Sequence, residues 1–510
     1  MCRARPASTS PRSLCVKTIN HWIGGELTEG TSGRFGAVTN PATGERSGQV
    51  ALASVSDVDT AVATAKEAFE SWRNASLAKR SQVLFAYREL LHRNRDEIAS
   101  LLTSEHGKVH SDALGEVARG LEVVEFACGI PQLLKGGYSE GASTSVDVYS
   151  LRQPLGVVAG ITPFNFPAMV PLWMFPIAIA CGNTFVLKPS EKDPSAALRV
   201  AELFGEAGLP PGVLNVVHGD ATAVNALLDH TDVKAVSFVG STPIAQHVYS
   251  RGTTAGKRVQ ALGGAKNHMI VLPDADMDLA ADAAVSAAYG SAGERCMAVS
   301  VLVAVGAAGD ELVPKITERI ANLRIGPGDD PKSEMGPLIT REHRDKVASY
   351  VEAGAAAGAS VVVDGRELSV DGDGFFLGVS LIDHVTPEMS VYTDEIFGPV
   401  LSVVRADSYD EGVRLINENQ WGNGAAIFTR DGGAARKFQN EVEAGMVGVN
   451  VPIPVPVSYY SFGGWKASLF GDSHAYGPEG VHFYTRGKVV TSRWPNPADR
   501  GIDLGFPQNR

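Results

Sequence analysis

The middle of the chain alternates short apolar runs with helix-like stretches, and this alternation restricts the fold more than any other feature. Several runs end at turn-forming pairs such as Thr162-Pro163 and Lys188-Pro189, as strands commonly do. Strands that alternate with helices form right-handed βαβ units and a mostly parallel sheet. The apolar runs of this first series are residues 157–161, 184–187, 213–217 and 235–239.

A second alternating series follows Gly263 and predicts a second α/β unit. It contains strand-like residues 270–272 and 299–305 on either side of a helix-like stretch, 279–289. The opening part of the chain is predicted to be mostly helical after a short strand and turn at residues 18–25. Helical periodicity covers residues 58–72, 77–102 and 111–129.

The composition fits a folded enzyme and argues against a nucleic-acid-binding protein. The chain has 510 residues, of which 44% are hydrophobic and 20% charged, and this length suits two or three domains. The net charge is -12, and no stripe of basic residues is present. The five cysteines are odd in number and lack CxxC or metal-site spacing, so the sequence predicts no disulfide framework, no metal and a reducing compartment.

Two segments bear on where in the cell the protein is located. Residues 168–187 are apolar enough to suggest a membrane span, but Pro171, Pro176 and a Cys-Gly-Asn triplet favour a buried helix that leads into a strand. Residues 1–15 are rich in Arg and Ser but lack the apolar face of a transit peptide, so a disordered tail or a misassigned start is predicted. The protein is therefore expected in the cytoplasm.

Polar motifs follow three of the predicted strands, where ligands bind in open α/β sheets. Exposed N–H groups and the Ser241 hydroxyl, at a predicted helix start, could hold a pyrophosphate, although an ordinary helix cap explains the same residues. Lys188 and Glu191 could bind ribose hydroxyls, or could form a solvated ion pair. A GxGxxG fingerprint is absent, because the two GxG stretches, at Gly372 and Gly422, lack the third glycine.

Three residues are candidates for the chemistry. Cys296 follows small residues that would allow close approach to its thiol, and Arg295 next to it would favour the thiolate; a packed core cysteine is the alternative. Asn165, between two prolines, could donate to an oxyanion together with the Cys296 N–H, or could simply occupy a turn. Glu395 could bind the nicotinamide ribose or a water molecule, or lie in a surface turn.

Taken together, these motifs resemble the aldehyde dehydrogenase superfamily from about Thr18 to Arg493. The motifs PFNFP, KPSE, FVGST, LGGAKN, GERC and DEIFGPV occur in the family's order and at family-like spacing. The segments around Cys296, His268, Asn165 and Trp465 look most like the branch of CoA-acylating methylmalonate-semialdehyde dehydrogenases.

The resemblance implies an aldehyde dehydrogenase fold of the α/β class and assigns a role to each motif. It implies a Rossmann-like NAD-binding domain (16–136 and 153–258), an α/β catalytic domain (259–450) and a small β oligomerisation flap (137–152 and 480–495), usually within a homotetramer. Cys296 would be the nucleophile and Asn165 the oxyanion donor. The residues implied to contact NAD are Thr162, Phe164, Lys188, Glu191, Lys192, Ser241, Gly263 and Glu395.

One departure from the wider family favours coenzyme A over water as the acyl acceptor. Hydrolytic members carry a glutamate base where this chain has Ala261, and alanine cannot accept a proton. A thiol needs less activation than water, since its pKa is about 8.5. Arg119, which matches a carboxylate-binding arginine of the family, and Arg295 would hold the substrate carboxylate. Without the resemblance, Arg119 would be read as a surface helix charge.

The expected reaction converts methylmalonate semialdehyde to propionyl-CoA, or malonate semialdehyde to acetyl-CoA, with NAD as oxidant and no metal. A hydrolytic aldehyde dehydrogenase acting on a small aldehyde is one alternative. A thiol-dependent acyl transferase or esterase, which would use Cys296 without redox chemistry, is another. A non-catalytic relative is a third.

Overall fold

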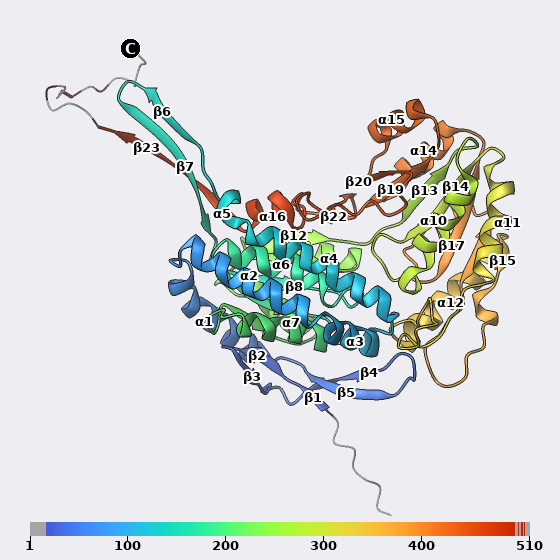
Figure 1. Cartoon of the computed structure of the whole chain (residues 1–510), viewed down its shortest axis with the longest axis horizontal. Coiled ribbons are helices and arrows are strands. Elements are labelled where there is room, and N and C mark those ends of the chain that lie inside the picture. Colours follow the sequence, from blue (N-terminus) through green and yellow to red (C-terminus); the bar gives the residue numbers. More distant parts are fainter. Residues whose placement is uncertain (1–16, 495–497, 499–500, 503, 505–510) are drawn as a thin grey trace, which may run out of the picture.

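The computed structural model describes residues 17–494, 498, 501, 502 and 504. The predicted tail, 1–15, residue 16 of the predicted NAD-binding domain and residue 495 of the predicted flap lie outside these residues. The described chain forms two lobes, each built around its own large sheet, and a long β arm projects from the first lobe (Figure 1). The α/β fold predicted from the alternating pattern is confirmed.

The sheet of the first lobe has eight strands in the order β22-β12-β11-β8-β9-β10-β2-β3. The central strands from β12 to β10 are parallel, and the outer strands β22, β2 and β3 are antiparallel to their neighbours. The four strands predicted first are therefore confirmed as β8, β9, β10 and β11. The bounds are β2 His21–Ile23, β3 Glu26–Thr28, β8 Val157–Ile161, β9 Thr184–Lys188, β10 Leu214–Val216, β11 Val233–Val239, β12 Arg258–Leu262 and β22 Leu469–Phe470.

Helices cover both faces of this sheet because its strands are apolar on both sides. In β8, Val157 and Ala159 pack in one core cluster with α1, α8 and α9, whereas Val158 packs in another with α2, α4, α6 and α7. The predicted helical stretch 77–102 is divided at Asn94 into α2 and α3. The bounds are α1 Val55–Trp72, α2 Leu77–Arg93, α3 Arg95–His106, α4 His110–Cys128, α5 Ile130–Leu133, α6 Met169–Ala180, α7 Ser195–Glu206, α8 Ala221–Asp229 and α9 Thr242–Thr254.

The apolar segment 168–187 is a buried helix followed by a strand, as predicted. Every residue of α6 is buried, and the chain passes directly from this helix through Cys181 and Gly182 into β9. Within the described part of the chain, no helix combines the length and the apolar character needed to cross a bilayer.

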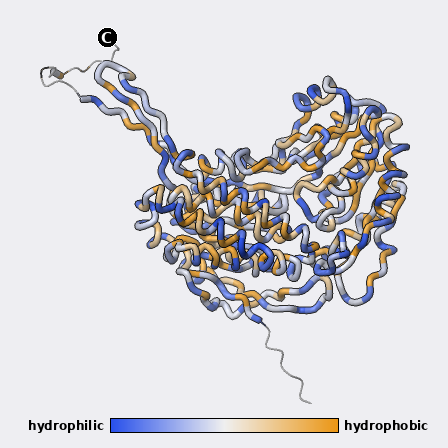
Figure 2. The backbone as a smooth tube through the Cα atoms, viewed as in Figure 1, coloured by the Kyte–Doolittle hydropathy of each residue, from blue (hydrophilic) through white to orange (hydrophobic). Residues whose placement is uncertain are grey.

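The second lobe contains a seven-stranded sheet in the order β15-β16-β17-β14-β13-β19-β20, parallel except for β15. Its side chains form one core, and Figure 2 shows hydrophobic residues gathered along the strands inside both lobes. The bounds are β13 Asn267–Val271, α10 Met277–Tyr289, η1 Gly290–Gly293, β14 Val299–Val305, α11 Ala308–Ile320, α12 Arg341–Ala356, β15 Ser360–Val363, η2 Gly365–Glu367, β16 Ser380–Asp383, α13 Ser390–Thr393, β17 Val400–Ala406, α14 Tyr409–Glu418, β19 Gly424–Phe428, α15 Gly432–Glu441 and β20 Met446–Val449.

The projecting arm is a three-stranded antiparallel sheet made from the two segments of the predicted flap. β6 (Tyr138–Ser143), β7 (Val146–Pro154) and β23 (Thr485–Arg493) pair in the order β23-β7-β6. The last strand starts later than the predicted limit of 480, because Gly477–Phe483 forms helix α16. The remaining strands are β1 Lys17–Ile19, β4 Phe35–Thr39, β5 Arg46–Ala51, β18 Trp421–Gly422 and β21 Trp465–Lys466.

Candidate active site

The three polar motifs of the first lobe lie at one edge of its sheet. β8 neighbours both β9 and β11 in parallel, with Ile161 in register with Lys188 and with Phe238. The segments that follow these strands therefore emerge side by side, which is where open α/β sheets bind ligands. Thr162 is tied to this edge through its N–H, which donates to the Lys188 carbonyl at 3.1 Å, and its buried hydroxyl has no hydrogen-bond partner.

Lys188, Glu191 and Lys192 follow β9 and combine a buried ammonium with an accessible carboxylate. The Lys188 Nζ atom, which is buried, lies 3.2 Å from Glu191 Oε2, and the Glu191 side chain is 39% exposed. The Lys192 Nζ atom lies over the Phe164 ring, 4.7 Å from its centroid. This arrangement leaves the Glu191 oxygens available to sugar hydroxyls, while the carboxylate would repel a phosphate on the same sugar.

Helix α9 begins at this edge with its N–H groups available. Ser241 is the N-cap residue, and its side chain makes no capping hydrogen bond. The helix dipole and the free N–H groups of a helix start attract phosphate oxygens. Gly263, at the end of the next strand, donates its N–H to the Ser468 carbonyl at 2.9 Å, and a Cβ there would lie 2.9 Å from the Ala467 carbonyl oxygen.

Cys296 follows a turn of unusual backbone conformation. Ser291, Ala292 and Gly293 have φ of 53°, 51° and 72°, a region that only glycine occupies without cost. Gly293 packs so closely on the segment before β17 that a Cβ would lie 2.2 Å from the Gly398 carbonyl oxygen.

Two asparagine side chains hold the Cys296 segment, and the sequence analysis missed both. The Nδ2 atoms of Asn267 and Asn423 donate to the Cys296 carbonyl at 2.9 and 3.2 Å. Asn267 belongs to the LGGAKN motif, and Asn423 lies between the two glycines at 422 and 424. The only available signal was their position within these motifs, because the contacts join residues distant in the chain.

The surroundings of Cys296 favour the protonated thiol. Burial raises the pKa of the Cys296 thiol to about 12, and the carboxylate of Glu395 acts in the same direction. Arg295 lowers this pKa as expected, but its effect is the smaller one, since its guanidinium is paired with Asp112 at 2.6 Å. Arg295 thus favours the thiolate, as expected, but burial has the larger effect on the thiol.

Cys296 lines a mostly apolar cavity of about 370 Å³ between the lobes, so its side chain is not sealed in the core. Arg119 and Arg295 also line this cavity. Arg119 is partly exposed, with its Nη1 atom 2.7 Å from Glu122 and its Nη2 atom donating to the Pro456 carbonyl at 2.9 Å. The other lining residues are Asp112, Gly115, Glu116, Phe166, Met169, Trp173, Met297, Ile453, Val455 and Phe462.

Asn165 is buried at the turn that supplies the wall of this cavity. Its carbonyl oxygen accepts a hydrogen bond from Lys108 Nζ at 2.7 Å, and Lys108 also pairs with Glu116 at 2.6 Å. Phe166, the next residue, lines the cavity together with Cys296. The backbone of the PFNFP turn is thus fixed beside the thiol, while the oxyanion role of the Asn165 amide stays a prediction.

Glu395 belongs to a second, narrower cavity that Cys296 also lines. Its Oε1 atom accepts the N–H of Ala265 at 2.9 Å, and burial raises the pKa of its carboxyl to about 7. Lys266, which the sequence analysis did not single out, donates to the Asp394 carbonyl at 2.7 Å, and burial lowers its pKa to about 7. Burial thus shifts the titration of Glu395 towards neutral pH.

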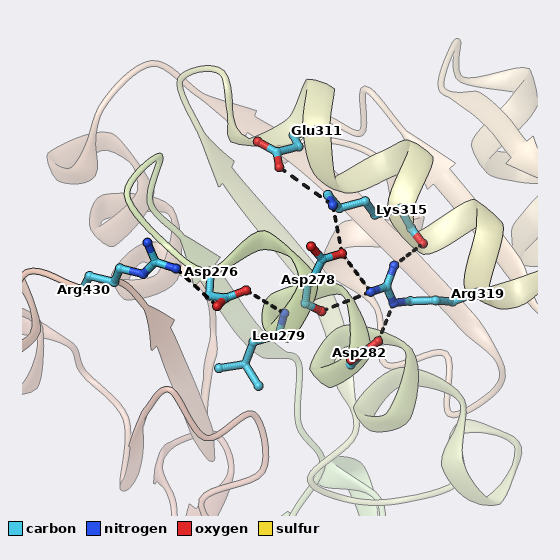
Figure 3. A network of polar contacts seen from close by, with 8 residues as sticks. All are labelled: Asp276, Asp278, Leu279, Asp282, Glu311, Lys315, Arg319 and Arg430. Atoms are coloured by element: carbon cyan, nitrogen blue, oxygen red, sulfur yellow. Dashed lines mark hydrogen bonds and ion pairs between the residues drawn. The ribbon is translucent and has the colours of Figure 1, made fainter.

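A third cavity, of about 490 Å³, lies in the second lobe on another side of Arg295. Asp282 and Arg319 line it and belong to the ion-pair network that joins α10 to α11 (Figure 3). In this network Arg319 binds Asp282 and also Asp278, the latter at 3.1 Å. Because these charged side chains are already paired with one another, the network connects the two helices and is not a ligand site.

The comparisons with known proteins agree with this geometry. Residues 27–490 match the model of the aldehyde dehydrogenase family. The chain is 58% identical over 494 residues to the malonate-semialdehyde dehydrogenase of Pseudomonas aeruginosa, covering 96% of this chain and 99% of that protein. It is 52% identical over 476 residues to the malonate-semialdehyde dehydrogenase of Halalkalibacterium halodurans, covering 93% and 98%.

Solved structures give the same result. The methylmalonate-semialdehyde dehydrogenase of Oceanimonas doudoroffii has a TM-score of 0.93 and 56% identity, over 95% of this chain and 99% of that one. A candidate methylmalonate-semialdehyde dehydrogenase from Sinorhizobium meliloti, solved in complex with NAD, has a TM-score of 0.94 and 53% identity, over 95% and 99%. The sequence, the fold and the cysteine at the cavity between the lobes all lead to one conclusion: this chain belongs to the aldehyde dehydrogenase family.

Proposed function

We propose that the protein oxidises methylmalonate semialdehyde and malonate semialdehyde with NAD and transfers the acyl group to coenzyme A, with loss of carbon dioxide. The names of its relatives support the substrate class. The observation that carries the proposal is the 370 Å³ cavity, in which the Cys296 thiol shares one lining with Arg119 and Arg295.

The two arginines suit a substrate that carries a carboxylate as well as an aldehyde. A guanidinium has five N–H donors, so the single carboxylate partner of each arginine leaves donors for a substrate anion. The apolar residues of the same cavity, among them Phe166 and Trp173, suit a short carbon chain. A small aldehyde without a carboxylate would leave the arginines without a partner from the substrate.

The residues at this edge of the first-lobe sheet, after β8, β9 and β11, fit NAD. The uncapped N-terminus of α9 suits the pyrophosphate, and the accessible Glu191 carboxylate beside buried Lys188 suits a ribose without a 2′-phosphate. Gly263 leaves the space that a side chain would fill. Thr162, Phe164 and Lys192 lie at the same edge, and Glu395 lies at the narrow cavity beside Cys296. When bound, NAD supplies the hydride acceptor.

The Cys296 sulfur then has the role of nucleophile. As the sulfur bonds to the aldehyde carbon, its proton must leave, and Glu395 is the carboxylate of the narrow cavity that can accept it. The Asn165 amide and the Cys296 N–H would stabilise the oxyanion, an effect of about 3–4 kcal/mol per donor. Loss of hydride from the same carbon leaves a thioester on Cys296.

The thioester carbonyl is β to the substrate carboxylate, so the electrons of the breaking C–C bond can enter that carbonyl as carbon dioxide leaves. The arginines hold the carboxylate until this step. The enolate that remains takes a proton from water at its α-carbon. Attack by the coenzyme A thiol then forms the new thioester as the carbon–sulfur bond to Cys296 breaks, and the proton of the attacking thiol passes to the Cys296 sulfur. Alanine has no group that can accept a proton, so Ala261 cannot activate water. Ala261 is also buried and lines neither of the cavities that Cys296 lines.

The test is NADH formation from malonate semialdehyde with and without coenzyme A. We expect steady turnover with coenzyme A, but only one rapid NADH equivalent per site without it, and no NADH from Cys296→Ala. Equal steady rates under both conditions would instead assign the protein to the hydrolytic members of the family. NADP in place of NAD is expected to give little product.

The arm supports a further part of the proposal, the assembly of a homotetramer in the reducing conditions of the cytoplasm. Tyr138 and Val489 on the arm strands are 65% and 69% exposed, and exposed apolar side chains on a projecting sheet favour contact with another subunit. The described cysteines, Cys128, Cys181 and Cys296, are free thiols, as a reducing compartment requires.

A further inference from the structure

A buried carboxyl group lies two residues before the nucleophile and has no strong partner. The Glu294 side chain is completely buried. Its Oε1 atom accepts one long hydrogen bond from the Ile339 N–H, at 3.3 Å, and its Oε2 atom has no hydrogen-bond partner. A buried carboxylate with so few donors is costly, so the neutral acid is the favoured form.

Two imidazoles approach this carboxyl group from different lobes. The Nε2 atom of His106, at the end of α3, lies 3.7 Å from Glu294 Oε2, and the Nε2 atom of His343, on α12, lies 3.7 Å from Oε1. His343 donates its Nε2 proton to the Phe397 carbonyl at 2.7 Å. His106 is buried, and neither of its ring nitrogens has a hydrogen-bond partner. The unpartnered oxygen of Glu294 and the unpartnered Nε2 of His106 thus face each other.

Aromatic rings connect this group to the segments that carry the proposed chemistry. The Phe164 ring lies 6.1 Å from the His106 ring and 5.8 Å from the Phe397 ring, measured between centroids. Phe164 immediately precedes Asn165, and Phe397 follows Glu395 by two residues. A shift of the Glu294 side chain would therefore be transmitted to Cys296 along the chain. Ring contacts would transmit it to the segments that contain Asn165 and Glu395.

We propose that Glu294 is a positioning residue that, as the neutral acid, donates its proton in a hydrogen bond to His106 Nε2 and so holds the Cys296 segment against the PFNFP turn. The bond requires the two atoms to approach by about 1 Å. Ionisation of Glu294 removes this donor and puts a buried charge at a carboxylate that the structure supplies with only one long hydrogen bond, from the Ile339 N–H. The Cys296 segment then loses its fixed position, and addition of the thiol to the aldehyde slows.

The surrounding charges set the pH at which this change occurs. The basic groups around Glu294 are Lys108, from the turn after α3, Lys192, from the segment after β9, and the two imidazoles. Lys108 and Lys192 favour the carboxylate, but burial outweighs them and raises the pKa of Glu294 to about 8. Burial, together with Lys108, holds the pKa of His106 well below its usual value, so His106 is neutral and can accept the proton.

The raised pKa of Glu294 makes the proposed hydrogen bond depend on pH. The acid form and its hydrogen bond persist below about pH 8 and are lost above it, so the defect should appear on the alkaline side.

The test compares Glu294→Gln with wild type in single-turnover NADH formation from propionaldehyde, without coenzyme A, between about pH 6 and pH 10. Glutamine keeps an N–H donor for His106 and cannot ionise. We expect the wild-type rate to fall above about pH 8, and Glu294→Gln to keep a neutral-pH rate within about threefold of wild type without the alkaline fall. Glu294→Ala should be slow at every pH.

Two further measurements make the result decisive. Glu105→Gln removes another buried acid, one that binds Ser195, and should keep the wild-type alkaline fall. The infrared difference between wild type and Glu294→Gln should contain the carbonyl band of a protonated acid, which disappears as the wild-type rate falls. An unchanged alkaline fall in Glu294→Gln, or no acid band at neutral pH, would overturn the proposal.

The inference rests on the assignment of Cys296 as nucleophile, but not on coenzyme A or on the semialdehyde. Absence of NADH from the wild-type enzyme with any aldehyde would refute the proposed function itself. NADH formation with an unaltered profile in Glu294→Gln would refute only the role of Glu294.

Discussion

The proposed cofactor edge, where the segments after β8, β9 and β11 emerge, and the Cys296 segment are built in opposite ways. At the cofactor edge, each motif directly follows a strand, and neighbouring parallel strands bring the motifs together. The Cys296 segment has positive φ angles and is held by Asn267 and Asn423 from elsewhere in the chain. The proposed dinucleotide site is thus made from local turns, whereas the proposed nucleophile depends on long-range contacts for its position.

The largest effect is expected at Gly293, where a side chain would disturb the Cys296 segment. Gly293→Ala places a Cβ 2.2 Å from the Gly398 carbonyl oxygen, and a displacement of the segment should lower kcat by about 100-fold. Gly256 is the matched control, because its φ is 73° but nothing lies within 4 Å of its Cβ position. Gly256→Ala should lose about 1 kcal/mol of stability and keep its activity. Equal kcat values would show that the segment tolerates displacement.

A smaller effect is expected from Arg119, which brings a charge from the first lobe to the thiol. Arg119→Leu should lower kcat/KM for malonate semialdehyde by about 10- to 100-fold, the worth of a charged hydrogen bond, and leave propionaldehyde within about threefold. Arg414→Leu, which removes an exposed guanidinium on α14, is the control and should change neither value. Equal losses for both aldehydes would remove Arg119 from carboxylate recognition.

The smallest effect is expected at the cofactor edge, where single contacts are replaceable. Ser241→Ala should raise the Kd for NAD by about threefold, because one neutral hydrogen bond is lost, while stability changes by less than about 0.5 kcal/mol. The contrasting variant is Ser408→Ala, since Ser408 caps α14 through the Glu411 N–H. That change should lose about 1 kcal/mol of stability and leave NAD binding unaltered. Calorimetry and thermal unfolding distinguish the two; an unchanged Kd in Ser241→Ala would separate its hydroxyl from the pyrophosphate.

Local patterns in the sequence were sufficient for the main strands of the first lobe and for several helices, and they placed polar motifs after the strands. The apolar run 157–161 is β8, the predicted buried helix is α6, and the turn at Ser241 opens α9. These features depend on residues a few positions apart, whose hydrophobic periodicity sets the local conformation. The same reasoning did not find β22, which pairs with β12 from more than two hundred residues away.

The sequence by itself determined the α/β fold and the motifs that contain the candidate residues Cys296, Arg295 and Glu395. Only the tertiary structure decided that burial would raise the pKa of Cys296 against the influence of Arg295, and that Glu294 would face His106. The physical reason is that side-chain type and periodicity are local properties. The dielectric surroundings and partners of a charge arise from packing between segments far apart in the chain.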